Sequence, residues 1–212
     1  MTDFFQLYGF KLIEAVVVHL YYVMVSVSLA LVTAIPSAVF LSRNLGLCRY
    51  ILPIVSASQT IPGIVFIGIL FIFLGMNSAT VFIALAVYAF FPILKNTYVG
   101  ILEIDPQYKE AALGCGMSTL QTIAMVELPL AAPTIFTGLK IACVYTVSWA
   151  VLASMIGLGG LGEFIYIGIS TNNNSLIFAG AVPAAILAIF LSYFIERLKT
   201  RCLRWHQRRE VK

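Results

Sequence analysis

The side chains able to do acid–base, nucleophilic or metal chemistry are few in this chain and lie far apart. The two histidines, His19 and His206, lie near opposite ends, and no acidic residues are paired as a general acid and base would be. The four cysteines lack the spacing of metal ligands, so we interpret them as packing residues. They are Cys48, Cys115, Cys143 and Cys202. The residues therefore predict a chain that is not an enzyme and that holds no metal or cofactor of its own.

The most regular set of spaced residues lies between Glu110 and Pro129, in a polar break within a mostly apolar chain. Glu110, Ala111 and Ala112 are followed by three residues and then Gly116. Glycine permits a sharp reversal, so we expect a short helical piece on either side of Gly116. The paired alanines predict a low ridge that a groove of another protein can approach. This segment is therefore predicted to be a helical knob that a partner protein contacts and displaces, and not a site of covalent chemistry.

The elements that must position this knob are membrane helices. Only 10% of the 212 residues are charged and 61% are hydrophobic, with a mean hydropathy of +0.99, which a soluble domain would not tolerate. Charges at Asp3, Lys11 and Glu14 precede the first apolar block and indicate that it is not a cleavable signal peptide. A span needs about 20 apolar residues. We predict one all-α membrane domain over residues 1–212, with about five transmembrane helices near residues 16–41, 51–74, 76–94, 130–155 and 176–195 and a loop over 95–129.

Basic residues predict the orientation of these spans. Arg43 and Arg49 follow the first span, Lys95 and Lys109 lie in the loop after the third, and a basic tail follows the fifth. The positive-inside rule therefore predicts an outer N-terminus and a cytoplasmic C-terminus, with the knob in the cytoplasm of a multi-pass cell-membrane protein. Since the tail directly follows a span, contact with anionic lipid headgroups is favoured over nucleic acid.

Four prolines lie within or beside the predicted spans. A single proline is ordinarily a packing kink, whereas several broken helices favour a transport path. They are Pro36, Pro53, Pro62 and Pro92. Gln59 and Thr60 place polar side chains directly before Pro62, inside the second span. Such groups need a partner or water, so they either line a path or form a hydrogen bond between helices.

Other features within the spans allow two interpretations each. Lys140 falls about ten residues into the fourth span, where a charge is costly, and we expect it to face the interior and extend toward the cytoplasm, with direct substrate contact as the alternative. His19 is expected at the outer interface. The glycines of Ile156–Gly162 lack the Lys-Ser/Thr ending of a phosphate loop and indicate a tight re-entrant turn. Aromatic side chains either pack or offer their faces to a cation. They are Tyr88, Phe90, Phe91, Tyr145 and Trp149.

The Glu110–Pro129 pattern resembles the EAA loop of the membrane permease subunits of binding-protein-dependent ABC importers. Every spaced position matches, with Val126 where isoleucine is usual. The resemblance extends from about His19 to Glu196. Further segments are similar to the osmoprotectant permeases, which carry glycine betaine, carnitine or choline. These segments are Ser58–Gly63, Tyr88–Pro92, Ile93–Ile101, Asp105-Pro106, Ile156–Gly162 and Thr171–Asn174.

This resemblance implies the fold of a type I ABC importer permease and a division of labour. An extracellular or periplasmic binding protein would deliver solute, a second permease subunit, identical or related, would help to enclose the path, and a cytoplasmic dimer of ABC ATPases would hold ATP and Mg²⁺. By motif match, the expected ATPase-coupling residues are Glu110, Ala111, Ala112 and Gly116. The candidate pathway residues are Gln59, Thr60, Pro62, Tyr88 and Pro92.

Two other functions are weighed against an osmoprotectant importer. Permeases for methionine or another small amino-acid-like solute share the size and the EAA loop. In an ion-coupled secondary carrier we would expect acidic residues inside the spans. The spans contain essentially none, which disfavours coupling to protons or sodium ions.

Overall fold

A computed structural model describes residues 2–210, except for the side chains of residues 2–5, 155–156 and 204–210. The described part is helical and has no strand, which confirms the all-α class. In chain order the elements are α1 (Thr2–Arg43), α2 (Leu45–Ser58), α3 (Gly63–Leu74), α4 (Ser78–Leu102), α5 (Pro106–Gly114), α6 (Thr119–Thr122), the π-helical turn η1 (Ile123–Glu127), α7 (Leu128–Ala153), a second π-helical turn η2 (Ser154–Leu158), α8 (Leu161–Ser170) and α9 (Asn174–Glu210).

Among the described residues, four helical stretches are long and apolar enough to cross a membrane, and α2 with α3 makes a fifth if that bent pair is one span. The expectation of about five spans agrees with this count. Two details differ from it. The second predicted span is bent by 96° between α2 and α3. Pro62 interrupts the helix there because proline has no N–H to donate to the carbonyl four residues earlier. Helix α4 runs on to Leu102 and does not end near Leu94, so the break before α7 is shorter than the predicted loop.

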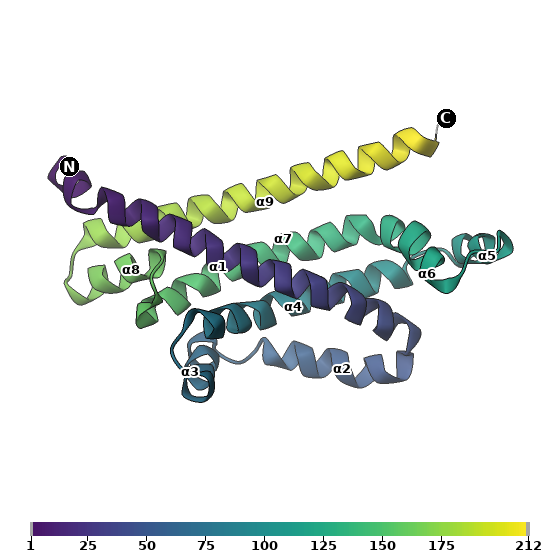
Figure 1. The fold of residues 1–212 in the computed structure, drawn as a ribbon, viewed down its shortest axis with the longest axis horizontal. Helices are drawn as coiled ribbons and strands as arrows, with labels where there is room; N and C mark the ends of the chain where they lie inside the picture. Colours follow the sequence, from purple (N-terminus) through teal and green to yellow (C-terminus); the bar gives the residue numbers. More distant parts are fainter. Residues whose placement is uncertain (1, 211–212) are drawn as a thin grey trace.

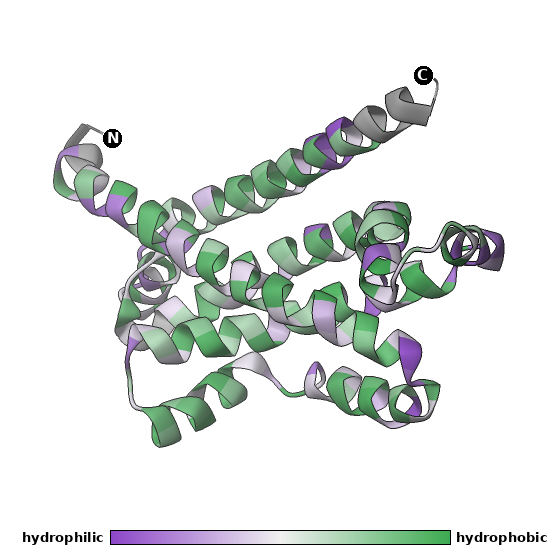
Figure 2. Ribbon diagram, turned by 45° about the vertical axis from the view of Figure 1, so that its right-hand side comes forward, coloured by the Kyte–Doolittle hydropathy of each residue, from purple (hydrophilic) through white to green (hydrophobic). Residues whose placement is uncertain are grey.

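The long helices α1, α4 and α7 pack against one another, and α9 covers α7 (Figure 1). The α5–α6 region and the C-terminal end of α9 lie at one end of the molecule, and the N-terminus and α8 lie at the other (Figure 1). Hydrophobic residues dominate the middle of the helices, and hydrophilic ones gather toward the two ends (Figure 2). This is the distribution that a bilayer selects.

Small residues hold α4 and α7 close together. A Cβ on Gly138 would come within 2.7 Å of the Pro92 carbonyl oxygen, and one on Gly100 within 1.9 Å of the Thr134 hydroxyl. Lipid offers helices no hydrophobic drive to associate, so close backbone packing of this kind carries much of the stability. The two helices therefore form a tightly matched pair, on which the other elements are mounted.

Candidate functional site

The reversal around α5 has a clear local cause. The Asp105 side chain caps α5 by accepting a hydrogen bond from the Gln107 N–H at 3.0 Å, and Pro106 occupies the first turn, where its missing N–H costs little. After α5 the chain turns at Gly116, which has φ +77°, and the Gly116 N–H donates to the Leu113 carbonyl at 2.9 Å. No heavy atom lies within 4 Å of a Cβ built on Gly116. Glycine is therefore needed for its left-handed backbone and not for space.

The structure separates the four predicted coupling residues into two groups. Glu110, Ala111 and Gly116 are exposed, whereas Ala112 is buried. The expectation that both alanines form an exposed ridge is wrong for Ala112. Helix α5 packs against η1, and adjacent helical residues point about 100° apart, so one alanine faces inward while the other faces out.

Large apolar side chains are exposed on α5, α6 and η1. Leu113 and Leu120 are 62% and 78% exposed, and Tyr108 and Met125 are also exposed. An apolar surface on a polar loop is typical of a protein–protein contact. These residues were not among the predicted coupling residues, although apolar side chains within the polar break were a signal for them.

The segment from residue 103 to residue 127, called the α5–α6 segment from here on, is fixed to the helices in two ways. Ile104 is buried in a small cluster with Ile101 of α4 and Ala131 of α7. Glu127, which is only 1% exposed, accepts two hydrogen bonds from Arg43 at the end of α1, at 2.6 and 2.7 Å. From the sequence, Arg43 served only to predict orientation, and Glu127 was not a candidate residue.

The break between α2 and α3 contains three of the predicted pathway residues, Gln59, Thr60 and Pro62. Pro62 precedes the first turn of α3 as its N-cap. The Thr60 hydroxyl donates to the Ala57 carbonyl of its own turn at 2.7 Å, so it does not form the hydrogen bond between helices that was one of the two alternatives. The Gln59 Nε2 is buried and has no hydrogen-bond partner among the described residues. An unpaired amide is costly to bury, so this group is suited to pairing with something that enters the site.

Tyr88 closes an aromatic cluster against this break. Its ring stacks on Trp149 of α7, with centroids 4.4 Å apart, and meets the Phe66 ring edge-on at 5.4 Å. Its hydroxyl donates to the Ile61 carbonyl at 2.9 Å, at the point where the helix is interrupted. Trp149 also lies directly over Gly63, because a Cβ there would fall 1.6 Å from the indole ring. The cluster therefore joins α3, α4 and α7 at the bend.

Pro92 lies one turn further along α4 and outside this cluster. It is buried, and its carbonyl accepts a hydrogen bond from the Asn96 side chain at 2.7 Å beside Gly138. The structure thus brings Tyr88 to the bend with Gln59, Thr60 and Pro62, and it places Pro92 in the α4–α7 interface.

The expectation that Lys140 faces the interior is wrong. Its side chain is 38% exposed and lies 3.1 Å from Glu196 of α9. His19 is fully buried among helices, and its Nε2 lies 3.2 Å from the Val147 carbonyl oxygen. The partner of each residue depends on helix rotation, which packing between distant segments sets.

The glycine-rich run forms the predicted tight turn between α7 and α8. Gly157, Gly159 and Gly160 all have positive φ, at +92°, +77° and +99°. The Tyr22 hydroxyl of α1 donates to the Leu158 carbonyl in this turn at 3.0 Å. Helix α8 has 10 residues, too few to cross a bilayer, so the chain turns back here into α9.

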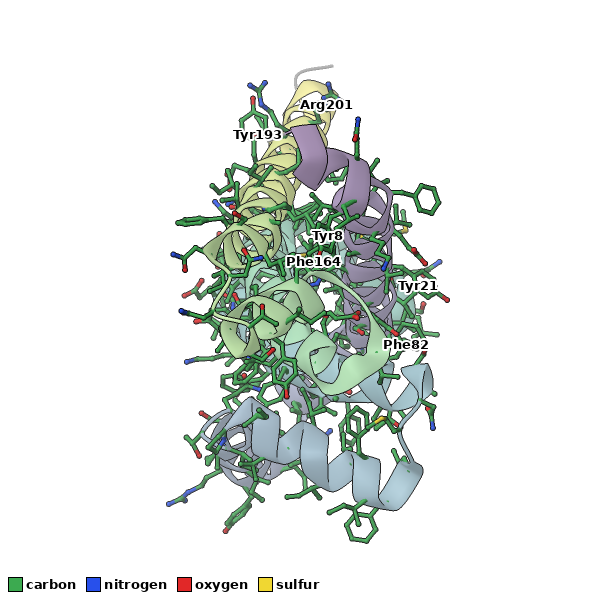
Figure 3. The ribbon with its side chains drawn as sticks, turned by 90° about the vertical axis from the view of Figure 1, so that its left-hand side faces the viewer. Tyr8, Tyr21, Phe82, Phe164, Tyr193 and Arg201 are labelled. Atoms are coloured by element: carbon green, nitrogen blue, oxygen red, sulfur yellow. The ribbon has the colours of Figure 1, made fainter. Side chains whose placement is uncertain are left out.

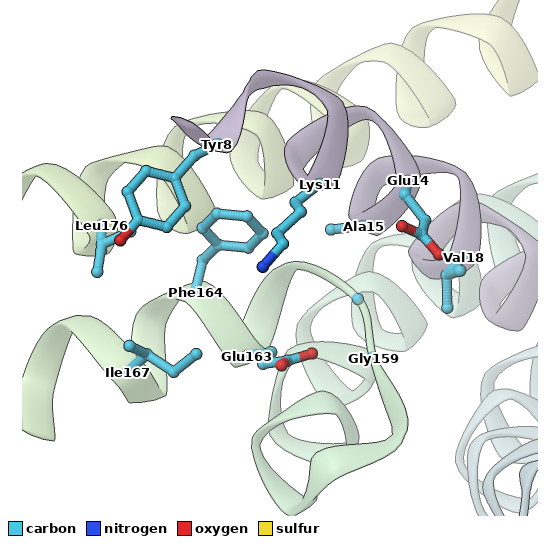
Figure 4. Close-up of a pocket in the computed structure, with 11 residues that line it drawn as sticks. Tyr8, Lys11, Glu14, Ala15, Val18, Gly159, Glu163, Phe164, Ile167 and Leu176 are labelled. Atoms are coloured by element: carbon cyan, nitrogen blue, oxygen red, sulfur yellow. The ribbon is translucent and has the colours of Figure 1, made fainter. Parts of the chain in front are cut away.

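A recess of about 290 Å³ separates the start of α1 from α8. Tyr8 and Phe164 meet edge to face across it, with ring centroids 6.3 Å apart (Figure 3). Lys11 extends into it from α1, and Glu163 comes from α8 (Figure 4). The recess thus carries charges of both signs. Its two sides come from α1 and α8, which are too far apart in the sequence for their contact to be predicted.

Among the described residues, no three His, Cys, Asp or Glu side chains lie close enough together to hold a metal ion. The features that remain are the exposed α5–α6 surface at one end, a broken span with an aromatic cluster, and a glycine turn at the other end.

Comparison with known proteins identifies this arrangement. Two curated relatives cover nearly the whole chain. The carnitine transport permease protein OpuCB of Listeria monocytogenes is 35% identical over 95% of this chain and 92% of its own length. The glycine betaine/carnitine/choline transport system permease protein OpuCB of Bacillus subtilis is 36% identical over 92% and 90%.

Solved structures share the fold. A chain of the inward-facing MetNI methionine ABC transporter superposes with a TM-score of 0.81 at 24% identity, covering 92% of this chain and 97% of its own. A chain of an amino acid ABC transporter gives a TM-score of 0.67 at 18% identity, covering 93% and 94%. These likenesses confirm the fold of a type I importer permease.

A family model described as the inner membrane component of binding-protein-dependent transport systems matches residues 19–204. Together with the relatives, this match means that the chain belongs to that family, as a multi-pass membrane permease subunit that transports solute and leaves ATP hydrolysis to a separate chain.

Proposed function

We propose that this chain is the permease subunit of an ATP-driven importer for small quaternary-ammonium osmoprotectants such as glycine betaine, carnitine or choline. The solute class is supported by curated relatives at 34–36% identity whose names carry these solutes. The likeness to the methionine transporter supports the fold alone, because its identity is only 24%. The observation that carries the proposal is the exposed α5–α6 surface on a capped, glycine-reversed helix.

In this proposal, α5 seats in a groove of a cytoplasmic ABC ATPase. Glu110 and Ala111 present the contact, and exposed Leu113 and Leu120 supply apolar area around it. Two such ATPases dimerise on ATP and Mg²⁺ and displace α5 in each of two permease subunits, identical or related. The nucleotide stays on the ATPases.

The proposed orientation puts the α5–α6 segment in the cytoplasm and the N-terminus outside, where a binding protein delivers solute. It is supported by the shared location of α5 and the basic C-terminal end of α9, opposite the N-terminus (Figure 1). Basic residues concentrate on the cytoplasmic side of membrane proteins.

The proposed path passes the break between α2 and α3. The Gln59 Nε2 has no hydrogen-bond partner among the described residues, and the Tyr88 and Trp149 rings present π-faces once their stack opens. Ring faces attract a quaternary ammonium without demanding hydrogen bonds, which such a cation cannot donate. In the present structure the stack is closed and Tyr88 is 1% exposed.

The test is uptake into proteoliposomes that contain this permease with its ATPase and binding protein. ATP should drive uptake of glycine betaine, carnitine or choline in preference to methionine. Gly116→Asp should remain in the membrane but lose both ATPase binding and uptake, because the exposed aspartate places a negative charge on the contact surface. Normal uptake by Gly116→Asp, or preference for methionine, would contradict the proposal.

A further inference from the structure

Glu127 is the most deeply buried acidic side chain among the described residues, and it lies at the end of the α5–α6 segment. Its two carboxylate oxygens both accept from one Arg43 nitrogen, at 2.6 and 2.7 Å. A buried carboxylate needs a charged or hydrogen-bonding partner, and Arg43, whose side chain is 36% exposed, supplies both. The pair therefore ties together two elements that are 84 residues apart.

The local backbone is built to present Glu127 inward. Residues 123–127 form a π-helical turn, in which the Leu128 N–H donates to the Ile123 carbonyl. The next residue, Pro129, has no N–H, and its ring would clash with the carbonyl of Met125 in an ordinary helix. The wide turn relieves that clash, and its extra residue rotates the helix face. Such turns are frequent at functional sites.

Arg43 occupies a joint. It is the last residue of α1, and α2 begins at Leu45 after the single residue Asn44. Helix α2 then runs for 14 residues to the break at Gln59. Helix α2 therefore connects the joint at Arg43 to the bend that Tyr88 closes at the Ile61 carbonyl.

Helix α1 packs along α4 and α7 through the main hydrophobic core, so these three helices form one body. The end of α1 meets the α5–α6 segment in two ways. Val39 packs against the cluster that contains Ile104, and Arg43 pairs with Glu127. In the described structure the ion pair is the charged contact at the α1–α2 joint, so displacement of the α5–α6 segment relative to that body acts on the joint through it.

We propose that Arg43 and Glu127 are positioning residues that relay displacement of the α5–α6 segment into the joint between α1 and α2, and so along α2 into the α2–α3 bend. The inference rests on the proposed function, because it needs a motor that displaces α5. Neither residue is required to touch solute or nucleotide. Their loss should uncouple ATP hydrolysis from transport without abolishing assembly.

The experiment compares Glu127→Gln and Arg43→Lys in the full transporter with its ATPase and binding protein. Glu127→Gln keeps the shape of the side chain and removes its charge. Arg43→Lys keeps the charge but replaces the planar guanidinium by an ammonium on a flexible stem, which loosens the placement of the charge against Glu127. The matched control is Glu196→Gln, which neutralises the exposed pair with Lys140 at 3.1 Å. For each variant, the measurements are ATPase co-purification, ATP hydrolysed, glycine betaine imported and the apparent KM for glycine betaine.

Both test variants should retain the ATPase and hydrolyse ATP, with an unchanged apparent KM, while glycine betaine imported per ATP falls by about fivefold or more. Glu196→Gln should match the wild type. The inference is overturned if the assembled test variants keep the wild-type ratio, if both lose the ATPase altogether, or if the control falls equally. Failure of the proposed function would appear separately, as wild-type protein without ATP-driven uptake or as normal uptake by Gly116→Asp.

Discussion

The aromatic cluster at the α2–α3 break gives a sharp prediction through Gly63. A methyl group on Gly63 would lie 1.6 Å from the Trp149 ring, so the indole must move and its stack with Tyr88 must open. Overpacking typically costs about 1–3 kcal/mol, and loss of an aromatic pair costs about 0.5–1.5 kcal/mol. Replacing a helical glycine by alanine stabilises the helix by up to about 1 kcal/mol, which offsets part of this loss. We therefore expect Gly63→Ala to destabilise the protein by about 1–3 kcal/mol.

The matched control lies in the same helix. Gly68 has no heavy atom within 4 Å of a built Cβ, so Gly68→Ala should leave stability unchanged or raise it. Thermal unfolding of the purified permease in detergent measures both effects, and Trp149 fluorescence should shift only in Gly63→Ala.

A double-mutant cycle separates this contact from any other effect of the methyl group. In a Trp149→Ala background the ring is absent, so Gly63→Ala should cost nothing further. Equal costs in the two backgrounds, or a Gly63→Ala protein as stable as Gly68→Ala, would refute the reasoning.

Two more predictions concern the bend and the reversal. Tyr88→Phe keeps the stack but leaves the Ile61 carbonyl without its hydrogen-bond donor. The free energy of unfolding should therefore fall by about 1–3 kcal/mol, as measured by thermal unfolding. A loss below the detection limit would mean that another donor replaces the hydroxyl. At Gly116, alanine should weaken ATPase binding more than asparagine does, because asparagine tolerates φ +77° and no side chain crowds the site; equal affinities in a binding titration would show that backbone strain is not the determinant.

Local features of the chain were predictable because their causes are local. Gly116 predicted the reversal, Pro62 predicted an interruption of the second span, and the glycines of residues 156–162 predicted a tight turn. Each depends on the backbone freedom of one or two residues. The number of spans likewise followed from the lengths and positions of the apolar stretches.

Contacts between distant helices could not be predicted. Lys140 meets Glu196 across 56 residues, and His19 meets Val147 across 128. Such pairs depend on the rotation and register of whole helices, which small residues such as Gly138 set by close packing. The Arg43–Glu127 link also depends on the π-helical turn, which no residue pattern in the sequence predicted.

The central claim is that this permease moves solute only when a motor displaces its α5–α6 segment. Proteoliposomes that contain the permease alone, or the permease with its ATPase and binding protein, should be compared for glycine betaine uptake at equal permease content. The account predicts ATP-dependent uptake by the complete assembly and none by the permease alone. Uptake by the permease alone, driven by an ion gradient or by no energy source, would contradict it.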